Sequence, residues 1–372
     1  MKITKVEVFP VSIPWFPKPH RSAGGTFTVQ EDTVIKIHTD QGLVGLGEAV
    51  YRPNLAGTQE INVLVLSKYF APALIGENPL EIARIIQKLG GADCPYLPAL
   101  HAVDIALYDI LGKATGQPLY RLLGGKTRES MGVSRSLPLG TPEEAAERAI
   151  ALKEKGYKLL TVKIGMDSEL DGRRILAVKK AVGDWPPVEA DINGAYTVDV
   201  AIKTLKRLEG VIDDVEQPVA PWDLFGMARV CEALDMPVIA DQGMITPRDV
   251  SLTIRLEAAD QICLKLAERG GITLANECVT IAKAANIPVS TGSAWPMGIG
   301  TAALHHWAIA NDWVRPPIGY GTPLERYNDD IITEPVHLKN GEVTVSDKPG
   351  LGVELDEKKM AKYATKITIK RD

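Results

Sequence analysis

The first third of the chain alternates apolar and polar residues with two different periods. Strands with one buried face are expected where the period is two, at "KITKVEVFPVSI" (2–13), "TVIKIHT" (33–39) and "GLVGLGEAV" (42–50). Helices that end at glycine are expected where the period is helical, at residues 58–76, 78–90 and 98–116. With Asp40, Gln41 and Gly42 as a turn, the strands predict an antiparallel meander. The first 120 or so residues therefore read as a separate α+β unit.

From about residue 130 the pattern changes to short apolar strands that alternate with amphipathic helices such as 141–156 and 246–258. The seven strands are "MGVSRSL" (131–137), "LLTVKIG" (159–165), "PVEADIN" (187–193), "VIDDVEQP" (211–218), "MPVIADQ" (236–242), "QICLKLA" (261–267) and "IPVST" (287–291). Strands without a polar face predict a parallel sheet, and this many closely spaced units favour a closed barrel over an open sheet. An eighth strand is then expected near "IGYGTPLE" (318–325).

The C-terminal segment changes character again. "VHLKNGEVTV" (336–345) predicts a hairpin that turns at Asn340 and Gly341, and we expect it to return to the N-terminal segment. The predicted fold class is α/β, a (β/α) TIM-like barrel with an α+β capping domain formed by the N-terminal segment and the C-terminal tail. The predicted boundaries are 1–120 for the capping domain, 121–332 for the barrel and 333–372 for the returning segment.

Composition and charge exclude several classes of protein. The net charge is −5, and no basic run is interleaved with aromatic residues, which argues against nucleic-acid binding. We expect the first residues to form a strand and not a secretory signal, and no apolar run reaches membrane-spanning length. The four cysteines, Cys94, Cys231, Cys263 and Cys278, form no C-x-x-C pair. We expect a cytoplasmic homo-oligomer that binds a small-molecule carboxylate and has no nucleic-acid or membrane partner.

Charged residues recur at the ends of five consecutive predicted strands. Lys163, Asp191, Glu216, Asp241 and Lys265 are separated by 28, 25, 25 and 24 residues. Because the carboxyl ends of barrel strands surround one site, these side chains should converge, with two lysines flanking three carboxylates.

This arrangement predicts a chemistry. Three crowded carboxylates repel one another unless a cation holds them, and oxygen ligands suit Mg²⁺ or Mn²⁺. Such a cation can bind a substrate carboxylate and stabilise the dianion formed when the adjacent carbon loses a proton. Burial and nearby positive charge would lower the pKa of each lysine toward the range of an acid-base catalyst. The pattern therefore predicts proton abstraction α to a carboxylate.

At these residues the sequence resembles the enolase superfamily, specifically the muconate lactonizing enzyme subgroup of the mandelate racemase/muconate lactonizing enzyme family. The resemblance is carried by "VKIG" (162–165), "DIN" (191–193), "VEQP" (215–218), "AD" (240–241), "LKLAERGG" (264–271), "GLVGLGEA" (42–49), residues 102–125 and "PGLGVELDE" (349–357). It implies Mg²⁺ bound by Asp191, Glu216 and Asp241, an enediolate intermediate, and Lys163 and Lys265 as the acid-base pair. A lysine on the sixth strand points away from the mandelate racemase branch, which has a His-Asp pair there.

Two positions depart from the subgroup. Thr161 stands where the subgroup has the first lysine of K-x-K, and Gln242 stands where it has an acidic residue. The subgroup has a cation at one position and an anion at the other, and both are neutral here. This suggests that Thr161 and Gln242 replace a salt-bridged pair. Glu325 lies at about the position of a subgroup glutamate on the eighth strand, but "PLERYNDD" around it matches poorly.

Substrate contacts are expected from two loops of the capping domain, at about residues 15–27 and 51–58. Their aromatic residues could form an apolar wall and their basic residues could meet a second anionic group: Trp15, Phe16 and Tyr51, and Lys18, His20, Arg21 and Arg52. Trp295 could stack on a cationic amine, and Asn193 could touch the site or stabilise a turn. The alternative for the loop residues is a role in a lid or an interface.

Several functions fit this pattern. The leading prediction is a Mg²⁺-dependent isomerase, either a racemase or epimerase of an amino-acid-like carboxylate or a muconate-type cycloisomerase. The alternative within the same chemistry is an acid-sugar or hydroxy-acid dehydratase. A Schiff-base aldolase, in which a barrel lysine condenses with a carbonyl, and a non-catalytic binding protein of the same fold are alternatives from other classes.

Overall fold

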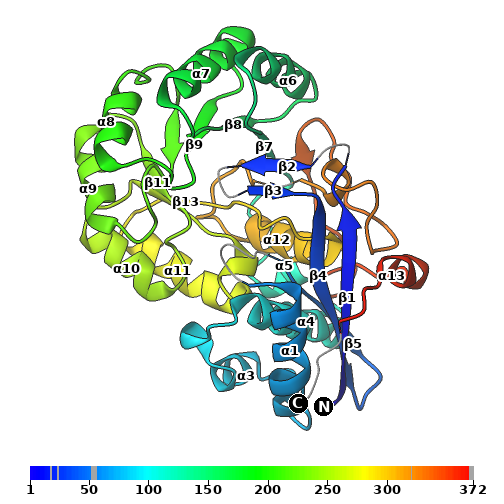
Figure 1. Ribbon diagram of the computed structural model, residues 1–372. Helices are drawn as coiled ribbons and strands as arrows, with labels where there is room; N and C mark the ends of the chain where they lie inside the picture. The colour runs from blue at the N-terminus through cyan, green and yellow to red at the C-terminus, as the bar shows by residue number, and fades with distance from the viewer. Residues whose placement is uncertain (17–18, 23–24, 52–56, 320, 368–372) are drawn as a thin grey trace.

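The centre of the fold is a curled, seven-stranded parallel sheet in which the spatial order of the strands follows the chain (Figure 1). The computed structural model describes residues 1–16, 19–22, 25–51, 57–319 and 321–367. The strands are β7 (Ser134–Leu137), β8 (Leu159–Lys163), β9 (Val188–Asp191), β10 (Asp214–Glu216), β11 (Val238–Ala240), β12 (Gln261–Cys263) and β13 (Val289–Ser290). The sequence-based prediction of a TIM-like barrel is confirmed.

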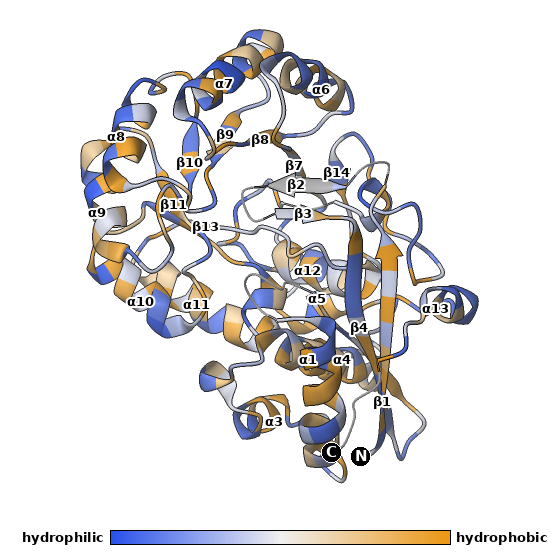
Figure 2. Ribbon diagram, viewed as in Figure 1, coloured by the Kyte–Doolittle hydropathy of each residue, from blue (hydrophilic) through white to orange (hydrophobic). Residues whose placement is uncertain are grey.

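Helices cover the outer face of this sheet, and they turn apolar residues inward and polar residues outward (Figure 2). They are α6 (Pro142–Glu154), α7 (Ser168–Val182), α8 (Val198–Lys206), α9 (Leu224–Ala233), α10 (Pro247–Arg255), α11 (Ile272–Ala284) and α12 (Gly298–Ala310). Thr141 and Thr246 begin α6 and α10 with capping boxes, which satisfy backbone N–H groups that the helix leaves unpaired. Helix α12 is the exception among these helices, since every one of its residues is buried.

The seventh and first strands are joined by an irregular segment. The N–H of Arg315 donates to the carbonyl of Val289 at 2.8 Å, and the N–H of Ser134 donates to the carbonyl of Ile318 at 2.9 Å. Because Pro316 and Pro317 have no N–H group, this segment forms single bridges and no ladder. The prediction of a strand over 318–325 is wrong: its described residues form none, and Pro323–Glu325 is a turn of 3₁₀ helix.

The capping sheet is an antiparallel meander of β1 (Ile3–Pro14), β4 (Val29–Thr39) and β5 (Val44–Ala49), as predicted. A short hairpin, β2 (His20–Ser22) and β3 (Gly25–Phe27), was not predicted. The helical elements that follow are α1 (Gln59–Val65), the π-helix Leu66–Phe70, α2 (Ala71–Leu74), α3 (Ile82–Lys88), the 3₁₀ turn Gly91–Asp93, α4 (Leu97–Thr115) and α5 (Leu119–Leu122). Within the described residues, none of the helices has the length and apolar character needed to cross a bilayer.

Helix α4 packs directly on the backbone of β5. A Cβ at Gly45 would lie 2.2 Å from the carbonyl oxygen of Ala106, and one at Gly47 would lie 2.0 Å from that of Ala102. No side chain fits at either position, which explains the glycines of "GLVGLGEA" by close approach. The helix lies between the capping sheet and the barrel and is buried on most sides.

The C-terminal tail contacts both parts of the molecule. Its strand β14 (Glu342–Val343) pairs with β6 (Met131–Gly132) at the start of the barrel, so the expectation that this hairpin returns to the N-terminal segment is wrong. Later residues do reach the capping sheet, since Ala364 bridges Val11 and helix α13 (Glu357–Tyr363) lies beside β1 (Figure 1). The domain boundaries at 120 and 332 stay a prediction.

A buried carboxylate joins the capping domain to the barrel. Asp104 of α4 accepts the N–H of Ile272 at 2.6 Å and the hydroxyl of Thr273 at 2.5 Å, at the N-terminus of α11. Gly271 has a φ of +107°, and a Cβ there would lie 2.3 Å from an oxygen of Asp104. The contact therefore satisfies donors of a barrel helix with a residue from the other domain.

Replacing Asp104 by Ala should lower the free energy of unfolding by about 1–3 kcal/mol, because buried N–H groups of α11 lose their acceptor. Urea denaturation followed by circular dichroism measures the change. Asp104→Asn is the matched control, since it keeps an acceptor oxygen of similar shape and should lose clearly less. Equal losses in the two variants would contradict this account.

The same residue predicts a pH dependence. Burial raises the pKa of Asp104 to about 7 in the folded protein, whereas an unfolded aspartate titrates near pH 3.9. A raised folded pKa adds stability below the unfolded value, and this stability is lost as pH rises through the folded value. The free energy of unfolding of Asp104→Asn, which does not ionise, should therefore rise relative to the unsubstituted protein between about pH 4 and pH 7. A constant difference would contradict this assignment.

Candidate active site

Strand register brings the predicted strand-end residues together. Lys163 is the direct cross-strand partner of Asp191, and Asp191 is that of Glu216. Asp241 and Lys265 come directly after or shortly after β11 and β12. Lys163, Asp191, Glu216 and Lys265 line one cavity of about 510 Å³ inside the barrel. All five predicted residues thus converge.

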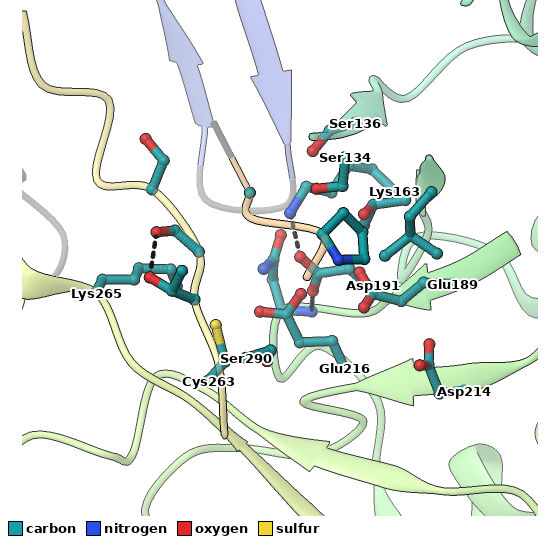
Figure 3. Close-up of a pocket in the computed structure, with 18 of the residues that line it drawn as sticks. Ser134, Ser136, Lys163, Glu189, Asp191, Asp214, Glu216, Cys263, Lys265 and Ser290 are labelled. Carbon is teal, nitrogen blue, oxygen red and sulfur yellow. Dashed lines mark hydrogen bonds and ion pairs between the residues drawn. The ribbon is translucent and has the colours of Figure 1, made fainter. Parts of the chain in front are cut away.

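The two lysines approach the carboxylates from opposite sides (Figure 3). The ammonium of Lys163 donates to Asp191, and the ammonium of Lys265 donates to both oxygens of Asp241. The charge of Glu216 acts on both lysines. The side chain of Lys265 is only 8% exposed and that of Lys163 only 13%, so both charges depend on their carboxylate partners for solvation.

The lysine pKa values shift in the direction opposite to the prediction. Burial lowers the pKa of Lys163, but the charges of Asp191 and Glu216 more than offset this, and the result lies above the ordinary value. Burial also lowers the pKa of Lys265, and the charges of Asp241, Glu268 and Glu216 together outweigh it, again with a net rise. In this arrangement both lysines are firmly protonated.

The carboxylates differ from one another in the same field. Burial, followed by the charges of Asp191 and Asp241, raises the pKa of Glu216 well above its usual range. Burial also raises the pKa of Asp241, but Lys265 and Arg269 outweigh it, so that this pKa is lowered. Of these two carboxylates, Glu216 is therefore the one that lacks nearby positive charge.

A possible metal-ligand cluster lies at this point. One ligand atom each from Glu216, Asp241 and Cys263 lies within 4.8 Å of the others. Asp191 is not in this group; its oxygens accept from Lys163 and from the N–H of Asn193, the latter at 2.9 Å. Two crowded buried carboxylates, one of them short of positive charge, fit a divalent cation with a preference for oxygen. Cys263 was missed, although its position two residues before Lys265 puts it on the same strand face.

The same alternation places further polar residues in the barrel interior. Thr161 is the cross-strand partner of Glu189, and its side chain favours the charged form of that carboxylate. Burial, then the charges of Asp214 and Asp191, raise the pKa of Glu189 to about 8. The residue that replaces the subgroup lysine thus has a partner of its own on the next strand. Gln242 also lines the cavity.

Aromatic residues close the cavity on the side of the capping domain. Phe27 of β3 and Trp295 line it, with ring centroids 5.1 Å apart. Trp15 lies edge-on to Trp295 at 5.2 Å. Phe16 is 54% exposed, so Phe27, which we did not single out, supplies the apolar wall.

Only some of the other residues predicted to contact the substrate line the cavity. Asn193 lines the cavity, whereas Glu325 lies beside Arg135 at 3.8 Å, and the residue after it, Arg326, lines the cavity instead. The N–H of Tyr51 donates to Asp32. Lys18 and Arg52 lie outside the described residues, as do the side chains of His20 and Arg21.

Comparison with known proteins decides the family. Residues 5–124 match the N-terminal domain of mandelate racemase/muconate lactonizing enzyme, and residues 143–359 match the enolase C-terminal domain-like family. The chain belongs to the mandelate racemase/muconate lactonizing enzyme family.

Members of this family with different activities are similar to the chain. N-succinyl-L-Arg/Lys racemase of Bacillus cereus is 31% identical over 96% of both chains, and muconate cycloisomerase 1 of Rhodococcus opacus is 32% identical over 96% of both. Cis-3-hydroxy-L-proline dehydratase of Roseibium aggregatum is 32% identical over 95% of this chain and 96% of its own. Sequence identity alone therefore does not separate isomerisation from dehydration.

Solved structures of the family share the whole architecture. The Bacillus cereus racemase superimposes with a TM-score of 0.92 at 31% identity and covers 98% of both chains. The dipeptide epimerase of Enterococcus faecalis, solved with Mg and the dipeptide L-Leu-L-Tyr, gives a TM-score of 0.89 at 28% identity over 95% of this chain and 99% of that one. Family enzymes typically use Mg²⁺.

Proposed function

We propose that the protein is a divalent-cation-dependent isomerase that moves a proton at the carbon next to a substrate carboxylate, with Lys163 and Lys265 as acid and base. The observation that carries the proposal is the opposed placement of two buried lysines across a carboxylate cluster in one cavity. In this placement each lysine would reach a different face of one substrate carbon. The racemases and epimerases among the relatives support this chemistry.

We further propose that Asp191, Glu216 and Asp241 hold Mg²⁺, with Mn²⁺ as an alternative. When bound, such a cation would hold the substrate carboxylate and offset the negative charge that develops on loss of the α-proton. Asp191 and Asp241 would then each interact with the cation as well as with a lysine. The attraction that keeps both lysines protonated would weaken, while burial, which lowers their pKa, would persist.

Each lysine would then have one role in each direction of the reaction. The neutral lysine accepts the α-proton at its Nζ atom, and the opposite ammonium donates a proton to the other face of the carbon. The capping domain covers the cavity, so the proton exchanges with these two groups more readily than with solvent. Inversion at the carbon follows.

Two other functions fit the site less well than this one. Dehydration by the same proton abstraction is the second candidate, favoured by the similarity to the hydroxyproline dehydratase. A Schiff-base aldolase is disfavoured, because a buried ammonium paired with a carboxylate is a poor nucleophile. The four cysteines are free, and on this ground we propose a reducing, cytoplasmic location.

Exchange in D₂O tests the lysines. With Mg²⁺ and a library of N-acyl amino acids, dipeptides, muconate and hydroxy acids, proton NMR should show loss of the α-proton signal for at least one member. Lys163→Ala and Lys265→Ala should each slow this exchange by on the order of 10²–10⁴-fold, because each removes an acid-base group.

Lys158→Ala is the matched control, since Lys158 lines the far end of the same cavity and lies 3.7 Å from Glu342 at the surface. The Lys158→Ala variant should exchange the α-proton of the substrate as fast as the unsubstituted protein does. Retained carbon skeleton indicates racemisation, whereas ring closure or loss of water indicates the other reactions. Exchange that persists in both catalytic variants would refute the proposal.

The affinity for the cation should depend on pH. Because the pKa of Glu216 is raised, this carboxyl carries a proton at lower pH, and cation binding must release it. Calorimetric titration with Mg²⁺ should show tighter binding as pH rises, with proton uptake by the buffer. Glu216→Gln should remove most of the affinity, and Glu334→Gln, at an exposed ion pair, should not. Binding independent of pH would contradict this role for Glu216.

A further inference from the structure

Cys263 is a buried thiol inside the active-site cavity. The residue is only 4% exposed, it lines the cavity, and its sulfur points into it (Figure 3). The sulfur is in no disulfide, and no residue that the structure describes is hydrogen-bonded to it. The proposed acid-base reaction does not use this thiol. A buried ligand atom without a partner is therefore directed into a site that is rich in negative charge.

Two carboxylates lie close enough to share a cation with this thiol. One ligand atom each of Glu216, Asp241 and Cys263 lies within 4.8 Å of the other two, and among the described residues no second group of three His, Cys, Asp or Glu side chains comes together in this way. Bonds from zinc to sulfur and to oxygen are about 2.3 and 2.0–2.2 Å long, so the ligand atoms of a tetrahedral site lie roughly 3–4 Å apart. Small rotations of the three side chains would close them around one ion.

Strand alternation places the thiol beside one of the two lysines. Cys263 ends β12 and precedes Lys265 by two residues, so both side chains face the barrel interior. They lie against Gly292, where a Cβ would be 3.1 Å from the sulfur of Cys263 and 2.7 Å from Cε of Lys265. The ammonium of Lys265 donates to both oxygens of Asp241. A cation bound to the thiol would therefore lie on the Lys265 side of the carboxylate cluster.

The types of ligand select the cation. A thiolate is a soft ligand that favours Zn²⁺ or Cd²⁺, whereas Mg²⁺ prefers oxygen ligands in octahedral geometry. The thiol gives its proton to the buffer when it becomes a ligand. Two carboxylates and a thiolate supply three ligands of a tetrahedral site and leave the fourth position to water. In the proposed function, Mg²⁺ would use the same two carboxylates together with Asp191 and not the thiol.

We infer that Glu216, Asp241 and Cys263 form a binding site for a thiophilic divalent cation such as Zn²⁺. Because this site shares two carboxylates with the proposed Mg²⁺ site, the two cations exclude each other. Asp191, which is paired with Lys163, is not among the ligands of the thiophilic cation. Zn²⁺ therefore inhibits the enzyme by occupying ligands that Mg²⁺ needs. The exclusion of Mg²⁺ rests on the proposed function, whereas the thiol site rests on its own three ligands.

Cd²⁺ is the probe that tests the site, because a cadmium–thiolate bond has an ultraviolet charge-transfer band that cadmium bound to oxygen lacks. The full-length protein is freed of metal by a chelator, kept reduced by a phosphine and titrated with Cd²⁺. We expect the band to saturate at one Cd²⁺ per chain. Zn²⁺ should remove the band, and an excess of Mg²⁺ should shift the titration to higher Cd²⁺ concentration. X-ray absorption at the zinc edge should show one sulfur ligand.

Variants locate the bound cation. Cys263→Ser should abolish the band and weaken Zn²⁺ binding, measured by calorimetry, by about tenfold or more, because a soft ligand is lost. The affinity for Mg²⁺ should stay unchanged. Cys278→Ser is the matched control, since Cys278 is a buried cysteine of α11 that does not line the cavity, and it should keep the band in full. If Cys263→Ser does not fold, the sulfur ligand seen by X-ray absorption in the unsubstituted protein still decides.

Three results would overturn the inference: no band in the unsubstituted protein, a band that persists in folded Cys263→Ser, or zinc bound by oxygen and nitrogen alone. Mg²⁺ that binds the protein without shifting the Cd²⁺ titration would overturn the mutual exclusion. These readouts are separate from catalysis. A cadmium–thiolate band without α-proton exchange would leave the thiol site standing and count against the isomerase, whereas exchange with Mg²⁺ and no band would do the reverse.

Discussion

Buried like charge at the carboxyl ends of neighbouring strands is the constraint on which the rest of this structure depends. Asp191 and Glu216 are direct cross-strand partners, and Asp241 lies close to Glu216. In a barrel interior such carboxylates repel one another and are poorly solvated. The two lysines offset part of the negative charge of these carboxylates, and a divalent cation would offset the rest. A shift of one residue in strand register would turn these side chains away from the cavity, so register and chemistry are inseparable here.

The capping domain is attached to the barrel through buried carboxylates at helix N-termini. Asp104 accepts N–H groups at the start of α11, and Glu48 of β5 accepts those of Met297 and Gly300 at the start of α12, at 2.6 and 2.8 Å. Both contacts place carboxyl oxygens where the helix backbone offers unpaired donors. Because the attachment is specific, Phe27 and Trp15 of the capping domain reach fixed positions over the cavity. The roof of the site is therefore built by the joint between the domains.

The two ends of the cavity are built from different parts of the chain. In the proposed function the strand ends supply the groups that act next to a substrate carboxylate, and the similar proteins include racemases, cycloisomerases and a dehydratase. The roof is assembled from the capping hairpin and from the segments around Trp295 and Arg326. These segments are loops, which can vary without disturbing the sheet beneath. On this view, differences among relatives in what they act on should be sought in the roof.

The sequence by itself determined the repeating strand and helix pattern, the antiparallel cap and the convergence of Lys163, Asp191, Glu216, Asp241 and Lys265. It could do so because these features depend on local periodicity, and because a parallel barrel brings all strand ends to one face. The strand expected at 318–325 failed for a local reason as well, since Pro316 and Pro317 interrupt the ladder just before it. Closure of the ring needs only single bridges from that segment, which periodicity does not reveal.

Only the tertiary structure decided which further side chains meet. Glu189 as the partner of Thr161, Cys263 beside Glu216, and Phe27 and Arg326 at the roof all depend on register between strands or on how the cap sits on the barrel. The direction of the lysine pKa shifts was also beyond the sequence. It is the sum of two large opposing effects, burial and attraction to carboxylates, and the attraction depends on separations of a few ångströms that no spacing along the chain specifies.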